Sequence, residues 1–376
     1  MIFLTYNDNY SGIYKSQVID VCSFIENEFN EKVKLVAFVS MRNYSGQKKL
    51  IKENYQNAVV LPMFPKVQFW KMNIFLLFFT CLFSGSRKIW ARGPFACNLA
   101  ISMKKIGLAK KVLFDARGAY LAELTEYDVV QNESVKSSIS FIEKKALTES
   151  DSQLAVSAKL AEWWKDQYDF IPVNFSIIPC TLSSYFSSLL PPGKEMEELK
   201  KALGFSKDDI VLVYSGSSAG WQSFNLVDDY LYTLINENRN LKIIFLSDTP
   251  PVQSKVFSHF KERVITKWVQ PQEVRNLLLA ADYGLLIREE SITNKVASPV
   301  KFAEYLSCGL QIIISEGIGD FTDFVKSKNC GFIYTDANKL VPVSQVQKEN
   351  NNKLALAHFS KRSAEIREGY KKLFNA

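Results

Sequence analysis

Short apolar runs alternate with longer amphipathic stretches along most of the chain. In the first half, the runs that read as strands are 2–5, 33–39, 58–61, 88–91, 112–115, 153–156 and 176–178. A second series comprises 210–214, 242–246, 263–266, 283–287 and 311–315. Short strands that alternate with helical stretches are typical of parallel sheets covered by helices on both faces. The pattern therefore predicts an α/β protein with two doubly wound sheets.

The alternation lapses over residues 183–207, where Pro191, Pro192 and Gly193 interrupt regular structure before a short charged helix. A length of 376 residues suits two cores of ordinary size. The expected division is an N-terminal domain at 1–185, a linker at 186–207, a C-terminal domain at 208–353 and a final helix at 354–376 that packs back on the N-terminal domain.

Charge and composition narrow the chemistry. A net charge of +7 suits phosphates or anionic lipid headgroups, and no RGG tract or zinc-finger spacing indicates nucleic acid. The six cysteines are scattered without a C-x-x-C pair, which favours buried thiols in a reducing, cytoplasmic compartment. The only histidines are His259 and His358, so a His-based triad or a His-rich metal site is not expected.

The first residues and the longest apolar run bear on membrane association. MIFLTYNDNYSG lacks a basic region and a small-residue cleavage site, and it predicts a first strand instead of a signal peptide. The run 72–83 is shorter than the roughly 20 residues that span a bilayer. A buried helix is the first expectation for it. Because Lys66, Lys71, Arg87 and Lys88 flank the run, a helix in a membrane interface stays open as well.

One segment carries the strongest functional signal. The strand 283–287 leads into a polar loop and then into a helix that is predicted to begin at Pro299. Ser298 can cap the free amides of this helix, and proline suits its first position. Gly309 ends the helix, and the strand 311–315 follows. Free N–H groups and the helix dipole at such a start favour a bound anion.

Lys301 and Glu304 lie three residues apart and share one face of this predicted helix with Cys308. A base and an acid near the start of the helix would suit a phosphate and a sugar hydroxyl, respectively. An exposed ion pair within the helix explains the same spacing, and spacing alone favours it.

The stretch SPVKFAEYLSCGLQIIIS, followed by GIGD, covers this helix, its start, the next strand and the next loop in one register. It resembles the signature of glycosyltransferase family 4 enzymes with the GT-B fold, especially those of capsule and O-antigen assembly. The resemblance implies two Rossmann-like domains that face each other across a cleft, and it implies that Glu304 binds the ribose of a nucleotide. Arg288, Glu289 and Asn294 match similar members, which makes Arg288 the expected ligand of the diphosphate; a solvent-facing arginine is the alternative.

Two further loops of the second domain are expected near the donor. Gly216 and Gly220 follow a strand, and small residues let backbone amides approach a phosphate, although a plain turn explains them equally well. In the enzymes that the chain resembles, the loop with Gly317 and Gly319 borders the donor sugar. A structural turn with Asp320 as a helix cap is the alternative.

The first domain offers weaker signals. Gly12 follows the opening strand and resembles a loop glycine that lies near the donor phosphates and the acceptor in family 4 enzymes. Asp115 and Arg117 stand in FDARGAY, which is similar to a DxRG sequence of capsule-type enzymes and implies acceptor contact or proton transfer. A plain salt bridge between them is the alternative. Glu123 and Glu126 are interpreted as solvated helix residues.

The resemblance implies a retaining, metal-independent enzyme that transfers a sugar from a nucleotide diphosphate sugar, expected to be UDP-linked, to a lipid-linked or oligosaccharide acceptor. The setting would be bacterial surface polysaccharide biosynthesis, in the cytoplasm or peripherally at the inner face of the cytoplasmic membrane. Positive side chains and helix ends would neutralise the leaving diphosphate. The expected catalytic residues are Asp115, Arg117, Arg288 and Lys301, and the expected donor-binding residues are Gly12, Gly216, Arg288, Asn294, Ser298, Lys301, Glu304, Gly317 and Gly319.

One position departs from the family pattern. Many members have a second glutamate eight residues before the ribose-binding one, and here that position is Val296. The departure keeps open an alternative function, a catalytically inactive nucleotide-sugar-binding scaffold subunit. A third hypothesis, a sugar-nucleotide 2-epimerase of the same fold, is disfavoured because the acid and histidine residues of such enzymes are not evident.

Overall fold

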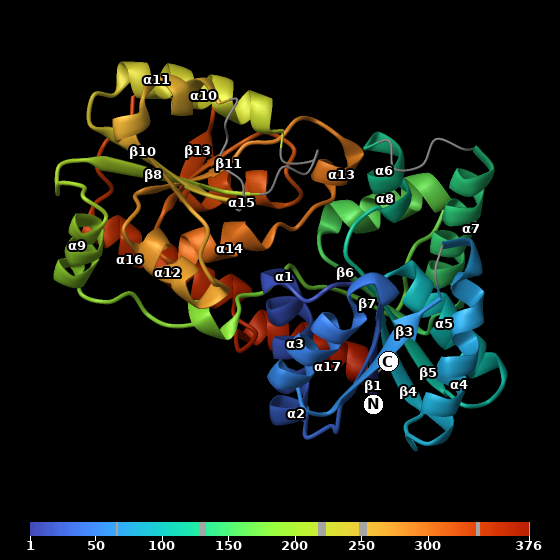
Figure 1. Ribbon diagram of the computed structural model, residues 1–376. Helices are drawn as coiled ribbons and strands as arrows, with labels where there is room; N and C mark the ends of the chain where they lie inside the picture. The colour runs from blue at the N-terminus through green and yellow to red at the C-terminus, as the bar shows by residue number, and fades with distance from the viewer. Residues whose placement is uncertain (65–66, 128–132, 217–222, 248–253, 336–338, 376) are drawn as a thin grey trace. The chain divides into compact units, whose positions relative to one another are not determined.

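The computed structural model describes residues 1–64, 67–127, 133–216, 223–247, 254–335 and 339–375 (Figure 1). The chain divides into two compact units, each with its own parallel sheet. Unit 1 comprises residues 1–183 and 364–376, and unit 2 comprises residues 184–363.

The sheet of unit 1 has the strand order β3-β2-β1-β4-β5-β6-β7, and every described pairing is parallel. This order, with strands added outward on both sides of β1 and β4, is that of a doubly wound fold. The seven strands predicted for the first half are confirmed, each within two residues at either end. They are β1 (Ile2–Tyr6), β2 (Lys34–Ser40), β3 (Ala58–Met63), β4 (Lys88–Arg92), β5 (Lys111–Ala116), β6 (Ser152–Ala155) and β7 (Phe175–Ile177).

The sheet of unit 2 has the order β10-β9-β8-β11-β12-β13 and is also parallel. Five of its strands were predicted; the sixth, β13, was not. Gly331 in β13 lies so close to β12 that an added Cβ would stand 2.0 Å from the carbonyl oxygen of Ile312. The strands are β8 (Ile210–Ser215), β9 (Leu241–Leu246), β10 (Val264–Lys267), β11 (Tyr283–Leu286), β12 (Gln311–Ile314) and β13 (Gly331–Ile333).

Helices connect the strands of both sheets, as a parallel sheet requires. In unit 1 they are α1 (Gly12–Tyr14), the π-helical η1 (Lys15–Ile19), α2 (Asp20–Phe29), the 3-10 turn η2 (Met41–Asn43), α3 (Tyr44–Asn54), the 3-10 segment η3 (Val67–Asn73), α4 (Ile74–Leu82), α5 (Pro94–Lys105), α6 (Tyr120–Glu126), α7 (Glu133–Glu149), α8 (Ala158–Tyr168) and α17 (Ala364–Asn375). In unit 2 they are η4 (Ser184–Phe186), α9 (Gly193–Ala202), α10 (Phe224–Glu237), α11 (Lys255–His259), η6 (Lys261–Arg263), α12 (Pro271–Leu279), α13 (Ile292–Lys295), α14 (Val300–Ser307), α15 (Phe321–Lys328) and α16 (Gln345–Phe359).

The segment expected as a linker, 186–207, contains α9 and belongs to unit 2. Lys200 of α9 reaches a buried Asp282 at 3.2 Å, and Lys348 of α16 reaches the same carboxylate at 2.9 Å. This ion cluster ties the segment to unit 2 because the buried acid has cationic partners from two helices.

The final helical stretch, expected as one helix from 354, is two helices that belong to different units. The earlier one, α16, extends back to Gln345 and lies in unit 2, whereas α17 lies in unit 1. In unit 1, Trp90 of β4 packs against Tyr370 and Phe374 of α17, with ring centroids 5.7 Å and 5.8 Å away. Because Tyr370 is 1% exposed, α17 is a core element of unit 1.

Two remaining predictions concern thiols and membrane spans. All six cysteines are buried thiols, which confirms that prediction. Among the described residues, no helix combines the length and the apolar character needed to cross a bilayer.

Candidate functional site

The helix predicted to aim at an anion, α14, follows β11 and the short α13 in unit 2. It begins at Val300, one residue later than expected, because Pro299 keeps an extended backbone (φ −66°, ψ 124°) and occupies the N-cap position. Ser298 therefore precedes the cap, and the expectation that it caps the helix is wrong. Gly309 ends the helix as predicted: its φ is +85°, and the Leu310 amide donates to the Tyr305 carbonyl oxygen at 3.1 Å.

Arg288 lies two residues after the end of β11, next to the end of β12. Its backbone amide donates to the Ser315 hydroxyl at 2.7 Å, and that hydroxyl donates back to the Arg288 carbonyl at 2.9 Å. Its guanidinium Nη1 donates to the Asn294 side-chain oxygen at 3.1 Å. Arg288 is only 8% exposed, so the alternative of a solvent-facing arginine does not describe it.

Asn294 of α13 joins three loops at this end of the sheet. Besides accepting from Arg288, its side chain donates to the Glu289 carbonyl at 2.9 Å, and its own carbonyl accepts the Gly319 amide at 3.1 Å. Gly319 has a φ of +48°, and a Cβ there would stand 2.0 Å from the Ala297 carbonyl oxygen. The close approach explains why this loop position has no side chain.

Lys301 and Tyr305 attach α14 to the end of β8. The Lys301 ammonium donates to the Ser215 carbonyl at 2.9 Å and lies 5.2 Å from the centre of the Tyr214 ring. The Tyr305 hydroxyl accepts the Ser215 amide at 2.9 Å. Gly284 in β11 makes room for Tyr305, since a Cβ there would stand 2.3 Å from its ring. Sequence reasoning missed both Gly284 and Tyr305.

The charges of Arg288, Lys301 and Glu304 influence one another. Burial lowers the pKa of Lys301 well below its usual range, and the Arg288 charge lowers it further, while Glu304 opposes the shift. Burial raises the pKa of Glu304 to about 7, against the charge of Lys301. Glu304 is partly buried, not extended into bulk water. Arg288, Lys301 and Glu304 lie at the carboxyl ends of β8, β11 and β12, and the pKa values of Lys301 and Glu304 are perturbed. These two cations and one acid are a candidate anion site.

The remaining predicted positions of unit 2 are three loop glycines and Asp320, and among those that the structure describes none has a side-chain contact that assigns it to a ligand. The Gly216 amide donates to the Leu246 carbonyl at 3.2 Å, and Gly220 lies outside the described residues. Gly317 has a φ of +68° with open space around its Cβ position. Asp320 occupies the N-cap position of α15, but its side chain makes no capping hydrogen bond.

Unit 1 has a cavity of about 350 Å³ at the carboxyl ends of β1, β4 and β5. Asp8 and Arg92 line it and form an ion pair at 2.9 Å. Arg117 and Glu123 line it as well. Gly12, predicted near this end of the sheet, begins α1 behind Ser11, whose hydroxyl accepts the Tyr14 amide at 3.2 Å.

Asp115 and Arg117 form the salt bridge that sequence reasoning left open. The Arg117 Nε lies 2.7 Å from one carboxylate oxygen, and its Nη2 donates to the other at 2.9 Å. The Trp90 indole N–H donates to the same carboxylate at 3.1 Å. Asp115 is fully buried, whereas Arg117 also faces the cavity, so an acceptor role stays a prediction for the arginine alone.

Glu123 differs from expectation, and a second glutamate near this cavity, Glu143, was not singled out in the sequence. Glu123, interpreted as solvated, lines the cavity, and burial raises its pKa. Glu143 of α7 accepts the amides of Tyr120 and Leu121 at 3.0 Å and 3.1 Å and the Tyr168 hydroxyl at 2.9 Å. It thereby fixes the first turn of α6 beside the cavity. No sequence spacing could reveal these contacts, because the partners lie more than 20 residues away.

Within the described residues, no three or more His, Cys, Asp and Glu side chains are grouped so as to hold a metal ion. The expectation that the reaction needs no metal stays a prediction.

Comparisons with known proteins establish the fold. No family model matches the chain, and no curated protein matches its sequence. Among solved structures, HepE of Anabaena, in complex with UDP and glucose, is 13% identical with a TM-score of 0.67 over 100% of both chains. TarM of S. aureus, in complex with fondaparinux, alpha-GlcNAc-glycerol and UDP, is 9% identical with a TM-score of 0.69 over 100% of both chains. A putative UDP-N-acetylglucosamine 2-epimerase from Listeria monocytogenes is 10% identical with a TM-score of 0.52, over 100% of this chain and 91% of that one. The predicted α/β GT-B fold is confirmed.

Proposed function

We propose that the chain is a glycosyltransferase that transfers a sugar from a nucleoside diphosphate sugar, with UDP as the proposed carrier. The proposed acceptor is a lipid-linked or glycan precursor of a bacterial surface polysaccharide. The observation that carries this proposal is the electrostatic group of Arg288, Lys301 and Glu304 at the end of the unit 2 sheet. Two cations held close together are relieved by a bound anion, and a diphosphate is the anion that the GT-B resemblance implies. HepE and TarM, which share the fold, were solved with UDP.

In the proposed mechanism, Arg288 and Lys301 bind the diphosphate, and Glu304 accepts hydrogen bonds from the ribose hydroxyls. The bond between the sugar anomeric carbon and the diphosphate oxygen breaks as the acceptor hydroxyl attacks, with retention of anomeric configuration. The two cations stabilise the negative charge that develops on the departing nucleoside diphosphate. The acceptor proton passes to that leaving group. Family 4 membership and a role in capsule or O-antigen assembly belong to the same proposal.

The acceptor side of the proposal includes a membrane surface. Helix α4 exposes Phe75 (64%), Phe79 (55%) and Leu82 (50%), while it buries Leu77 and Cys81 against unit 1. An apolar helix face beside basic residues is typical of interfacial helices. We therefore place the enzyme peripherally at the cytoplasmic membrane. Co-flotation with vesicles of anionic phospholipid, lost in Phe79→Ser, would support this placement.

Donor use is tested by UDP binding, measured calorimetrically, and by nucleotide release from a panel of nucleoside diphosphate sugars. Arg288→Ala and Lys301→Ala should each weaken UDP binding by about tenfold to a hundredfold, because each removes charge-assisted hydrogen bonds. Lys295→Ala is the matched control, since Lys295 is an exposed cation of neighbouring α13. Unchanged binding and release in both folded variants would refute the assigned site.

A second candidate function is the inactive nucleotide-sugar-binding scaffold. The observation that favours it is Val296, which is 2% exposed and so packs in the core where many family members carry a glutamate. Saturable UDP binding without nucleotide release from any donor, across a screen of sugar and lipid-linked acceptors, would decide for the scaffold.

A further inference from the structure

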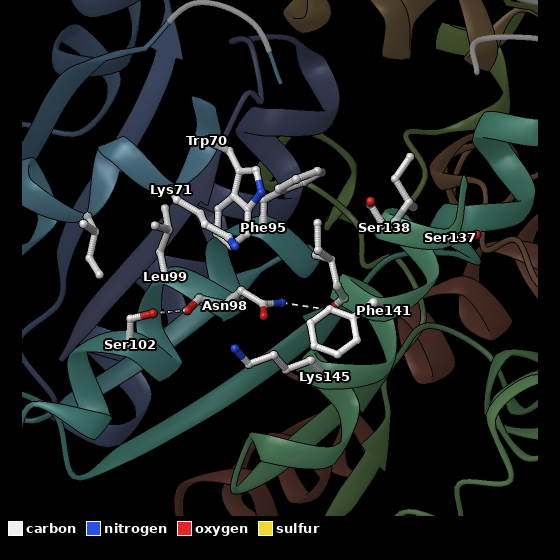
Figure 2. Close-up of a pocket in the computed structure, with 13 residues that line it drawn as sticks. Trp70, Lys71, Phe95, Asn98, Leu99, Ser102, Ser137, Ser138, Phe141 and Lys145 are labelled. Carbon is white, nitrogen blue, oxygen red and sulfur yellow. Dashed lines mark hydrogen bonds between the residues drawn. The ribbon is translucent and has the colours of Figure 1, made fainter. Parts of the chain in front are cut away.

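Unit 1 contains a second and larger cavity, separate from the one that Asp8 and Arg92 line. It is a groove of about 970 Å³ between η3 and α4 on one side and α7 on the other, with α5 between them (Figure 2). Both α4 and α7 pack against α5. A volume of this size lies within the range of sites for organic ligands.

The floor of the groove is largely apolar. Phe95 and Leu99 of α5 are buried, and Ile142 of α7 adjoins them. Asn98, the polar side chain of the floor, uses its amide nitrogen on the carbonyls of Pro94 (2.9 Å) and Ile142 (2.8 Å), and so fixes α7 on α5. A hydrocarbon chain would be stabilised on this floor by the apolar surface that it removes from water.

Both walls carry a cation. Figure 2 shows Lys71 on the η3 wall and Lys145 on the α7 wall. Among the residues that the structure describes, no carboxylate pairs with either lysine and no acidic side chain lines the groove. The charge of the walls therefore suits an anionic group on an otherwise apolar ligand.

The groove reaches the start of α4, a helix with an exposed apolar face. Ile74, the first residue of α4, lines the groove, and Phe75 and Phe79 of the same helix are exposed. On the opposite wall, Phe141 of α7 lines the groove and is 67% exposed. A lipid lying in a bilayer that contacts α4 would thus meet an apolar passage into unit 1.

We propose that this groove receives the hydrocarbon chain of an anionic membrane lipid, whose phosphate is held by Lys71 and Lys145. The inference rests on the proposed function, in which the acceptor is lipid-linked, and it specifies which part of unit 1 holds the lipid. The groove would position the acceptor without taking part in sugar transfer.

The test measures calorimetric binding of decyl phosphate, below its micelle concentration, to the full chain, beside decanol and inorganic phosphate. Decyl phosphate should saturate one site, decanol should bind more weakly, and inorganic phosphate should not bind at the same concentrations. Lys71→Glu with Lys145→Glu should weaken decyl phosphate binding by about tenfold and bring it to the level of decanol. The control pair Lys52→Glu with Lys165→Glu makes the same change in net charge at exposed positions away from the groove and should have no effect.

The space itself is tested at Ser102, which lines the groove from α5 and whose hydroxyl donates to the Asn98 carbonyl. Ser102→Trp places an indole ring in the groove and should weaken the binding of both decyl phosphate and decanol by about tenfold. Ser102→Ala should leave both affinities within about twofold. Thermal unfolding checks that each variant is folded. If inorganic phosphate binds as tightly as decyl phosphate, or if neither Ser102→Trp nor the charge-reversed pair weakens binding, the proposal is overturned.

UDP binding by the same variants separates this inference from the proposed function. Ser102→Trp should leave UDP binding unchanged, because the groove lies in unit 1 and the proposed donor site in unit 2. Absence of decyl phosphate binding together with intact, Arg288-dependent UDP binding would reject the groove and leave the donor assignment standing. Decyl phosphate binding without Arg288-dependent UDP binding would support the groove and reject the donor assignment.

Discussion

Both sheets place charged side chains beyond the carboxyl ends of their strands, but the two units hold those charges differently. In unit 1, opposite charges are joined: Asp115 to Arg117, and Asp8 to Arg92. In unit 2, the Lys301 ammonium is held by a backbone carbonyl, and the charge of Arg288 lowers its pKa.

The difference is between an acid and a base in direct contact and two cations whose charges influence each other. A buried acid and base in contact satisfy each other, and the fold depends on the pair because removing one member leaves the other without compensation. Two neighbouring cations instead raise the free energy of the empty protein, and an anionic ligand recovers that cost on binding. At these strand ends, the ion pairs of unit 1 thus contribute to stability, whereas the proposed donor site of unit 2 would gain from a bound anion.

The largest expected effect is on the salt bridge of unit 1. Arg117→Ala should lower the free energy of unfolding by about 3–5 kcal/mol, because it leaves Asp115 buried without its cation. Chemical denaturation followed by fluorescence measures the change. UDP binding by the folded fraction should be unaltered. A variant of wild-type stability that has lost only acceptor turnover would instead identify Arg117 as an acceptor ligand and break the comparison.

A smaller effect is expected at Gly284 in unit 2. Gly284→Ala places a methyl group against the Tyr305 ring, and overpacking of this kind costs about 1–3 kcal/mol. Since Tyr305 belongs to α14, UDP binding should weaken along with stability. The matched control is Gly118→Ala beside the unit 1 cavity, where a Cβ would meet nothing within 4 Å. Equal denaturation midpoints for the two variants would contradict the assigned packing.

The smallest effect is a pH dependence that originates at Glu304. Burial raises its pKa from the ordinary value of 4.5 to about 7. Between pH 4.5 and pH 7, the carboxyl group therefore holds a proton in the folded protein that it has lost in the unfolded chain. The contribution of Glu304 to the free energy of unfolding therefore falls as pH rises through that window. Glu304→Gln should remove this pH dependence of the free energy of unfolding. UDP binding should tighten by up to about tenfold from pH 6 to 8, because Glu304 ionises over this range and its carboxylate accepts hydrogen bonds from the ribose hydroxyls. Calorimetry of the wild type showing flat affinity over that range would count against this role.

Much of the fold could be read from local patterns. The strands were predictable because both sheets are parallel and buried, so each strand is a short apolar run. The end of α14 was predictable because Gly309 alone suits the left-handed conformation there. Its start was displaced by one residue because Ser298 and Pro299 fit either of two neighbouring cap positions, and only the extended backbone of Pro299 decides between them.

The candidate site was predictable where a motif lies within one stretch of sequence, as Lys301 and Glu304 do. It was not predictable where tertiary packing creates the environment. Gly284 is an ordinary strand residue until Tyr305 is packed over it, and Glu123 looks like a solvated helix residue until the cavity beside α6 is formed. The groove beside α5 could not be anticipated either, because it forms only where α7 packs on α5 opposite η3 and α4.

The assignment of α17 to unit 1 constrains the order in which the protein can fold during synthesis. Residues 364–375 leave the ribosome after the whole of unit 2, yet Tyr370 packs against Phe24 and Trp90 in the core of unit 1. Until those residues emerge, Phe24 and Trp90 lack the ring of Tyr370 that packs against them, whereas every residue of unit 2 is already available. A nascent chain stalled before α17 emerges would hold a finished second half and an unfinished first half, which reverses the usual N-to-C sequence of domain maturation.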